Sequence, residues 1–168
     1  VLLWLTLRET RLIGQAEVRA YKLYRIGQVR STSDGAGRLE GVSVVGKLEN
    51  CGQSPAYDVE LGGLLSMTCP EISEEPDRRI TFALVSSYLA PGISLDAATV
   101  QIPIKNFIDN PDLAKTLWGM VVVRYRDVFK TTQYAWIRGE FCRPDGKALP
   151  FSDIREAAAN NLVSWKNA

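Results

Sequence analysis

The sequence predicts a mainly-β protein, an antiparallel β-sandwich of about seven strands with an N-terminal helix, one short internal helix and a C-terminal helix. Two observations lead to this fold class. Runs rich in β-branched and aromatic residues recur at a spacing typical of a sandwich, and loops rich in Gly, Pro, Ser and Asp separate them. With 168 residues, 46% of them hydrophobic and 23% charged, the chain can bury the core of one such domain.

The expected strands follow one another from residue 18 to residue 142. They are Val18–Ile26, Gly37–Asn50, Tyr57–Leu65, Arg79–Val85, Ser94–Ile104, Trp118–Asp127 and Thr131–Cys142. Apolar residues alternate with polar ones in several of them, which indicates that one face of the strand is buried. The expected core residues are Val44, Leu48, Val59, Leu61, Val121, Val123, Ile137 and Phe141.

Three segments have the composition of helices and set the domain boundaries. Residues 1–16 contain many helix formers, one Gly and no Pro. In Asp109–Leu117, Asn110 can cap a helix and Pro111 suits the first helical position. In residues 151–168, Ser152 is the expected N-cap of a helix whose apolar stripe is Ile154, Ala157, Ala158, Leu162 and Trp165. Residues 17–150 between the terminal helices are the expected β-sandwich domain.

The stretch NCGQSPAY, Asn50–Tyr57, predicts a corner at which the chain leaves one sheet and enters the other. Asn50 and Gly52 tolerate left-handed or otherwise unusual backbone dihedral angles. Pro55 cannot donate a hydrogen bond to a strand ladder. The stretch LAPG, Leu89–Gly92, predicts a second corner of the same kind.

Four stretches carry a family resemblance, and they are Gly14–Tyr21, Glu49–Val59, Leu89–Gly92 and Tyr125–Phe129 with the later Phe141 and Cys142. From Leu7 to Cys142 the chain resembles a family of uncharacterised bacterial and prophage proteins with one N-terminal transmembrane helix and an immunoglobulin-like β-domain. The family pattern N-x-G-x-x-P-A is matched from Asn50 to Ala56. The chain departs from the family at Lys130, where glycine is usual, and in a longer segment before Phe141. The resemblance implies an immunoglobulin-like fold and a membrane location, and it implies no activity.

The segment Val1–Leu7 is apolar except for Thr6, but it is too short to cross a membrane by itself. We expect it to be the end of a longer transmembrane helix, with Trp4 at the membrane interface and Arg8 and Arg11 at the headgroups. The positive-inside rule then favours a single-pass protein with a cytoplasmic β-domain, because further basic residues follow: Arg19, Lys22, Arg25 and Arg30. The alternative is a helix that docks on the sandwich or in an oligomer core.

The composition excludes several classes of active site. The chain has no histidine, which excludes Ser-His-Asp and Cys-His systems and His-containing metal sites within it. A net charge of +1 gives no general attraction to nucleic acid, so we expect no nucleic-acid partner. Three cysteines leave one unpaired in any disulfide scheme, which favours a reducing compartment and leaves one disulfide with a free thiol open.

The other candidates for chemistry have simpler interpretations. The loop carboxylates Glu74, Glu75 and Asp77 are expected to be solvated rather than acid–base catalysts. For Asp109, Asn110 and Asp112, helix capping is a simpler interpretation than metal binding. Cys51 and Cys142 are expected to be small buried residues rather than nucleophiles. A dinucleotide motif is incomplete, since Glu40 stands where its third glycine belongs. We therefore expect no cofactor, no metal and no catalytic activity.

The hairpin expected from Trp118–Asp127 and Thr131–Cys142 carries a candidate docking surface. Side chains alternate between the two faces of a strand. With the predicted core residues inside, the outer face carries Arg124, Arg126, Tyr134, Trp136 and Arg138. Three guanidinium groups beside two aromatic rings suit a peptide, an anionic group or a partner domain. The simpler interpretation, which we favour, is an ordinary exposed face held by cross-strand cation–π pairs.

Three hypotheses for function remain. The sequence favours a non-enzymatic, membrane-anchored β-sandwich that acts as an interaction module for a protein partner or for a second copy of itself. The second hypothesis is a soluble structural or assembly protein whose N-terminal helix packs in an oligomer. The third is an enzyme that uses carboxylates or cysteine alone.

Overall fold

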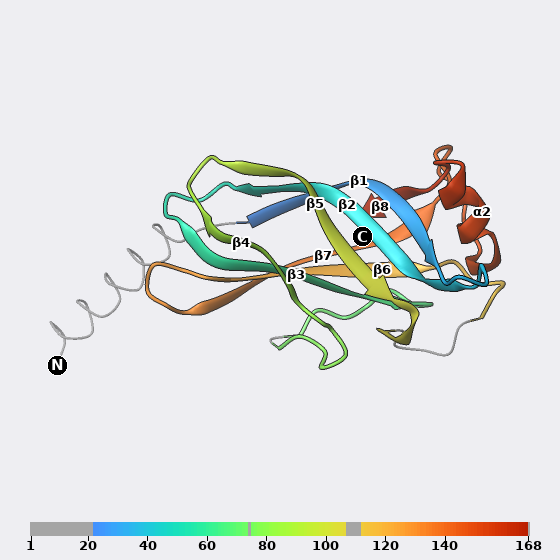
Figure 1. Ribbon diagram of the computed structural model, residues 1–168, viewed down its shortest axis with the longest axis horizontal. Coiled ribbons are helices and arrows are strands. Elements are labelled where there is room, and N and C mark those ends of the chain that lie inside the picture. Colours follow the sequence, from blue (N-terminus) through green and yellow to red (C-terminus); the bar gives the residue numbers. More distant parts are fainter. Residues whose placement is uncertain (1–21, 74, 107–111, 168) are drawn as a thin grey trace, which may run out of the picture.

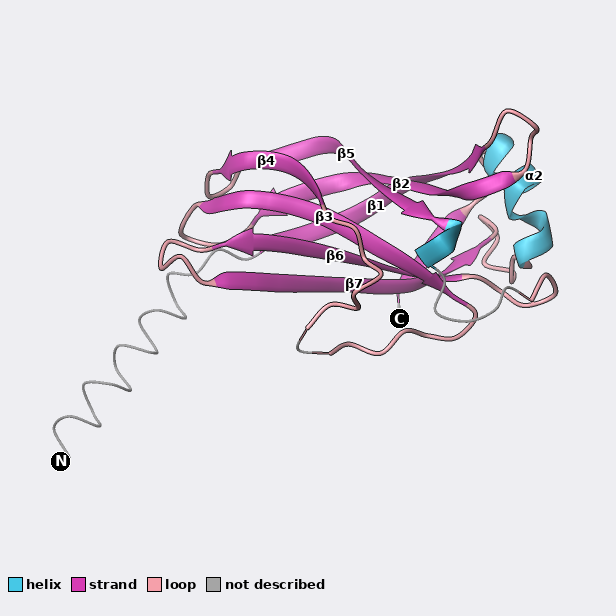
Figure 2. Ribbon diagram, turned by 60° about the horizontal axis from the view of Figure 1, so that its bottom comes forward, coloured by secondary structure: helices cyan, strands magenta, loops and turns pink. Residues whose placement is uncertain are grey.

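The computed structural model describes residues 22–73, 75–106 and 112–167. Within these residues, eight strands form two antiparallel sheets that pack face to face as a sandwich (Figures 1 and 2). The three-stranded sheet has the order β1-β2-β5, and the five-stranded sheet has the order β4-β3-β6-β7-β8. The strands are β1 (Lys22–Ser33), β2 (Leu39–Asn50), β3 (Ala56–Ser66), β4 (Ala83–Leu89), β5 (Ser94–Pro103), β6 (Trp118–Arg126), β7 (Thr132–Cys142) and β8 (Ser164–Asn167).

The predicted antiparallel sandwich is confirmed, and β1 to β7 account for the expected strands up to Cys142. β4 begins at Ala83 rather than at Arg79, and the described residues between β3 and β4, 67–73 and 75–82, form no strand. The predicted N-terminal helix, with Trp4, Arg8 and Arg11, lies outside the described residues and stays a prediction. In the part of the chain that the structure describes, no helix is long and apolar enough to cross a membrane.

The prediction of a short internal helix is wrong for residues 112–117, the described part of Asp109–Leu117. Residues 112–117 form turns and an isolated bridge between Thr116 and Pro150. The backbone of this segment pairs with the C-terminal segment instead: Phe151 N–H donates to the carbonyl of Lys115 at 2.9 Å. Among the described residues, the helical turn nearest to this segment is the 3₁₀ helix η1 (Ile104–Asn106).

The C-terminal helix is shorter than predicted. It consists of the 3₁₀ helix η2 (Phe151–Asp153) and α2 (Ile154–Ala159), and Ser152 lies within η2 instead of capping the helix. Asn161 takes a left-handed conformation with φ 56°, and Leu162 N–H donates to the carbonyl of Ala157 at 2.7 Å. A left-handed residue with this backward hydrogen bond ends a helix.

Residues 164–167 form strand β8 instead of the last turns of the predicted helix, because Trp165 packs against β7 of the five-stranded sheet. Trp165 pairs with Phe141 of β7, and the two rings meet edge to face with centroids 5.0 Å apart. A Cβ atom on Gly139 would lie 2.4 Å from Trp165 Nε1, so only glycine leaves room for the indole. This long-range contact outweighs the helical spacing of the apolar residues.

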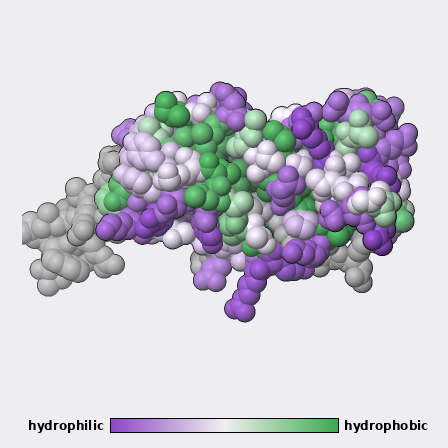
Figure 3. Space-filling model, viewed as in Figure 1, coloured by the Kyte–Doolittle hydropathy of each residue, from purple (hydrophilic) through white to green (hydrophobic). Residues whose placement is uncertain are grey.

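The core lies between the inner faces of the two sheets. Seven of the eight predicted core residues are buried: Val44, Leu48, Val59, Leu61, Val121, Val123 and Phe141. Ile137 is only partly buried, because β8 pairs with β7 only along Gly139–Cys142 and stops short of it. Hydrophobic residues also reach the surface between β4 and β5 (Figure 3), where Val85 and Leu95 are partly buried against the core.

Tyr24 of β1 hydrogen-bonds to both other strands of the three-stranded sheet. Its hydroxyl reaches from β1 to the carbonyl of Ala98 on β5 at 2.9 Å and to the carbonyl of Val44 on β2 at 3.2 Å. The ring is 3% exposed, and burial raises the pKa of the phenol. Tyr24 therefore joins all three strands of this sheet through one side chain.

Hydrogen bonds of the Asn50 side chain stabilise the predicted corner, and the unusual backbone dihedral angles that the sequence suggested do not. Neither Asn50 nor Gly52 has a positive φ, so unusual dihedral angles do not explain the corner. The Asn50 side chain is completely buried, and its Nδ2 donates to the carbonyls of Ser54 at 2.9 Å and Leu89 at 3.0 Å. Its Oδ1 accepts the Gly52 N–H at 3.1 Å. One amide thus joins β2, the corner and the end of β4.

The backbone of Asn50 binds the second predicted corner as well. Asn50 N–H donates to the carbonyl of Ile93 at 3.1 Å, and Gly92 N–H donates to the carbonyl of Asn50 at 2.8 Å. Gly92 has φ 72°, a left-handed conformation that favours glycine. The two corners, from β2 to β3 and from β4 to β5, are therefore one hydrogen-bonded unit.

Replacing Asn50 with Ala should destabilise the protein by about 2–4 kcal/mol, because two buried carbonyls and one partly buried N–H lose a hydrogen-bond partner. Urea unfolding followed by circular dichroism measures the change. Ser54→Ala is the matched control, since Ser54 Oγ is buried and has no hydrogen-bond partner among the described residues. That control should leave stability unchanged or raised. Equal stability of Asn50→Ala and the parent protein would contradict the role of the amide.

Candidate docking surface

The strand register places the five predicted docking residues on one face of the β6–β7 hairpin. Arg124 lies opposite Tyr134, Val122 opposite Trp136, and Met120 opposite Arg138. Their neighbours Val121 and Val123 point into the core, so these side chains point away from the three-stranded sheet. Arg126, at the end of β6, lies opposite Thr132 on the same face. We call this the outer face.

A loop covers half of the outer face. Residues 67–82, which connect β3 to β4 and which we call the strap, bury Ile80 against Leu64, Met120 and Val122 of the sheet. Phe82, Tyr134 and Trp136 are partly buried against this second, smaller cluster. Arg138 Nη1 donates to the carbonyl of Pro70 in the strap at 3.1 Å. Trp136 and Arg138 are therefore half-buried and not freely presented.

The strap is a feature that the sequence analysis missed, although the sequence holds a trace of it. Met120–Val123 is an unbroken apolar run in β6. A strand with one exposed face alternates, whereas a strand buried on both faces reads as continuous. The run therefore indicated that something covers the outer side of β6.

The half of the outer face near the end of β6, where the strap contributes Phe82, is built from ion pairs. Arg124 Nε donates to Glu60 Oε2 at 2.5 Å, and the Arg124 guanidinium carbon lies 4.1 Å from the centre of the Phe82 ring. The hydrogen bond that Arg124 donates to Glu60 raises the pKa of Arg124, which stays positively charged. Arg126 Nε donates to Asp58 Oδ2 at 2.7 Å. Both carboxylates come from β3, which lies beside β6 in the sheet.

These pairs surround a shallow depression, and its lining residues are Asp58, Glu60, Leu84, Arg124, Tyr125, Arg126, Thr132 and Tyr134. The surface is thus a set of matched charges beside aromatic and apolar groups, rather than a cluster of free cations. Leu84 is 61% exposed and the Arg126 side chain 52% exposed, so both are accessible to a partner. The cation–π contact that the structure shows joins Arg124 to Phe82 next to β4, instead of to Tyr134 across the hairpin.

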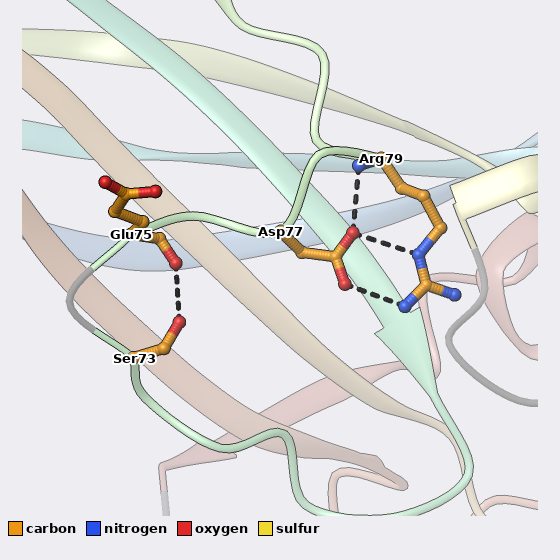
Figure 4. A network of polar contacts seen from close by, with 4 residues as sticks. All are labelled: Ser73, Glu75, Asp77 and Arg79. Atoms are coloured by element: carbon orange, nitrogen blue, oxygen red, sulfur yellow. Dashed lines mark hydrogen bonds and ion pairs between the residues drawn. The ribbon is translucent and has the colours of Figure 1, made fainter.

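The loop carboxylates do not form an acid–base pair (Figure 4). Asp77 Oδ1 accepts hydrogen bonds from Arg79 N–H and Nε at 2.9 Å each, and Asp77 Oδ2 accepts one from Nη2 at 2.7 Å. These bonds lower the pKa of Asp77 to about 2, so its carboxylate stays ionised at neutral pH. Glu75 enters the network through its backbone carbonyl, which accepts from Ser73 Oγ at 2.5 Å, while its carboxylate points away from Asp77. Glu74 lies outside the described residues.

The other candidate groups are also dispersed. Asp112 Oδ1 accepts the Ala114 N–H at 3.1 Å in a turn, and Asp109 and Asn110 lie outside the described residues. Within the described ranges, no group of three or more Cys, Asp or Glu side chains is arranged to hold a metal ion.

The cysteines correct one expectation. Cys51 is exposed at the corner, contrary to the prediction that it is a buried residue. It lies beside Asn50, whose side chain fills the interior of the corner instead. Cys142 is buried as predicted, and burial raises the pKa of its thiol, which disfavours the reactive thiolate. Cys69, in the strap, is exposed, and all three thiols are free.

Comparison with known proteins adds no family to this description. No protein-family model matches the chain, and no curated protein sequence matches it.

Proposed function

We propose that this chain is a non-enzymatic, membrane-anchored interaction module with an immunoglobulin-like β-sandwich on the cytoplasmic side of the membrane. The observation that carries the proposal is the half of the outer face near the end of β6. There, Arg124, Arg126 and Tyr134 lie together with the exposed Leu84 around one depression. Arginine and tyrosine beside an apolar group are the residue types that dominate binding energy at protein interfaces.

The strand order supports the immunoglobulin-like part of the proposal. β1, β2 and β5 form one sheet, while β3, β6 and β7 form the other with β4 on its edge. An immunoglobulin-like sandwich likewise places its first, second and fifth strands in one sheet and its third, sixth and seventh in the other. β8 extends this plan at the other edge.

The membrane part of the proposal is supported by the apolar segment Val1–Leu7 and by the basic residues that follow it. The family resemblance of residues 7–142 points the same way. The three free thiols are compatible with a reducing cytoplasm.

Replacing Arg126 with Ala should weaken partner capture by about 1–3 kcal/mol, which corresponds to a loss of affinity of roughly 5- to 150-fold. The domain should remain folded, because the Arg126 side chain is half-exposed. Crosslinking and capture of the full-length protein from its native host, followed by titration of the captured partner, measure the loss. Lys147→Ala is the control, since Lys147 is an exposed cation beyond the far end of β7. Equal loss in both variants would count against the outer face.

Cells that express the full-length protein should hold it in the membrane fraction, and protease added to spheroplasts should leave the β-domain intact. The anchor would retain the protein, and the cytoplasmic position would shield the domain. Immunoblotting against the β-domain reads out both steps. Recovery in the soluble fraction would contradict the anchor and favour the oligomer hypothesis. Digestion in intact spheroplasts would instead reverse the orientation.

A further inference from the structure

One end of the sandwich carries an exposed apolar surface, and it is the end at which β1 begins. Lys22, the first residue of β1, pairs with Asn50, the last residue of β2. The β2–β3 corner, the β4–β5 turn and the β6–β7 turn all lie at this end (Figures 1 and 2). The large apolar or aromatic side chains exposed there are Tyr57, Tyr88, Ile93, Val128 and Phe129, and we call them the tip surface.

Strand pairing, one ring contact and one backbone hydrogen bond bring these residues to the same end of the sandwich. Tyr57 lies opposite Tyr88 across β3 and β4, with ring centroids 5.6 Å apart. Tyr57 also lies opposite Arg126, the last residue before the turn that carries Val128 and Phe129. The carbonyl of Ile93 accepts the Asn50 N–H, which fixes the β4–β5 turn to the same corner.

The turn that presents Val128 and Phe129 is rigidly built. Asp127 is 1% exposed, and its Oδ1 accepts the N–H groups of Phe129 and Thr131 at 2.9 Å each. Gln133 Nε2 donates to the second carboxylate oxygen at 3.1 Å. A turn held from inside in this way cannot fold its apolar side chains back into the core. Phe129 remains 42% exposed and Val128 37% exposed.

The charges near this end are mixed, and Glu49, next to the tip on β2, is a partly exposed carboxylate. Asp58 is paired with Arg126, and Asp96 is paired with Lys47 at 3.8 Å. Asp127 is buried within its turn. Lys130, next to Phe129, is exposed and has φ 63°.

We infer that the tip surface rests on the lipid headgroup region of the bilayer, with Val128 and Phe129 inserted at the interface. Residues 8–21 connect Leu7 to Lys22, and even a fully extended segment of this length reaches only about 50 Å. An anchor that ends near Leu7 would therefore hold the end of the sandwich where β1 begins within that distance of the membrane. Tyrosine is enriched at the boundary between headgroups and acyl chains, where phenylalanine and valine add apolar surface, and Lys130 contributes one positive charge.

This inference rests on the proposed membrane anchor and adds an orientation to it. Two native cysteines give the means to test that orientation. Cys51 is exposed in the β2–β3 corner, at the tip. Cys69 is exposed in the strap, just beyond the opposite end of β3. Cys142 is buried and is protected from labelling in the folded protein.

The experiment uses the full-length protein with either Cys69→Ser or Cys51→Ser, so that one exposed thiol remains for an environment-sensitive fluorophore. The labelled proteins are reconstituted into vesicles of phosphatidylcholine and phosphatidylglycerol that contain headgroup spin labels. Quenching should be several-fold stronger at Cys51 than at Cys69. Replacing Val128 and Phe129 together with Ser should reduce the quenching at Cys51 towards that at Cys69, while the protein still sediments with the vesicles.

The outcomes separate the two proposals. Protein that sediments with vesicles but is quenched equally at both positions overturns the orientation and leaves the anchor standing. Protein that stays in the supernatant overturns both. A fluorescence change at Cys51 that depends on protein concentration and not on the spin-labelled lipid shows a second copy at the tip, which also overturns the inference.

Discussion

The buried amide of Asn50 is the interaction on which this end of the sandwich depends. Two sheets that pack through apolar side chains alone have little to fix how the chain crosses between them. Here, one side chain from β2 donates to the corner that leads into β3 and to the last residue of β4. The backbone of the same residue pairs with the turn into β5. A buried polar group is costly unless its hydrogen bonds are made, so the site accepts one arrangement of these segments and disfavours others.

The β6–β7 hairpin links this constraint to the proposed function. β6 is buried on both faces, by the core on one side and by the strap on the other, which makes it the central support of the five-stranded sheet. Arg124 and Arg126 continue the same strand beyond the strap, and Asp127 then turns the chain to present Phe129. The proposed docking face and the proposed lipid-facing tip are therefore neighbours on one hairpin. A partner held at Arg126 would lie close to the membrane surface, so the two proposals reinforce each other in space.

The sequence predicted what depends on neighbours along the chain and missed what depends on neighbours in space. Strand alternation and the Gly and Pro residues between strands are local features, so seven strands and most of the core were predicted, although β4 lies four residues later than expected. Alternation also placed Arg124, Tyr134 and Trp136 on one face. Their acidic partners, Asp58 and Glu60, belong to β3, and nothing local indicated that β3 lies beside β6. Trp165 has the spacing of a helical residue in the sequence. In the structure its indole packs over Gly139, where no Cβ is in the way, and this places Trp165 in β8. The corner at Asn50 was predicted for the wrong reason. Asn50 stabilises it through hydrogen bonds and not through its backbone dihedral angles.

Amide hydrogen exchange at Asn50 and Gly92 tests the central role of this corner most directly. Both N–H groups lie in corner segments, where exchange through local opening is ordinarily fast. If the Asn50 unit joins the two sheets, both amides exchange only through global unfolding, with the same opening free energy as Val121 in the middle of β6. Exchange at Asn50 and Gly92 that is orders of magnitude faster than at Val121 would show that the corner opens by itself, and would contradict this role.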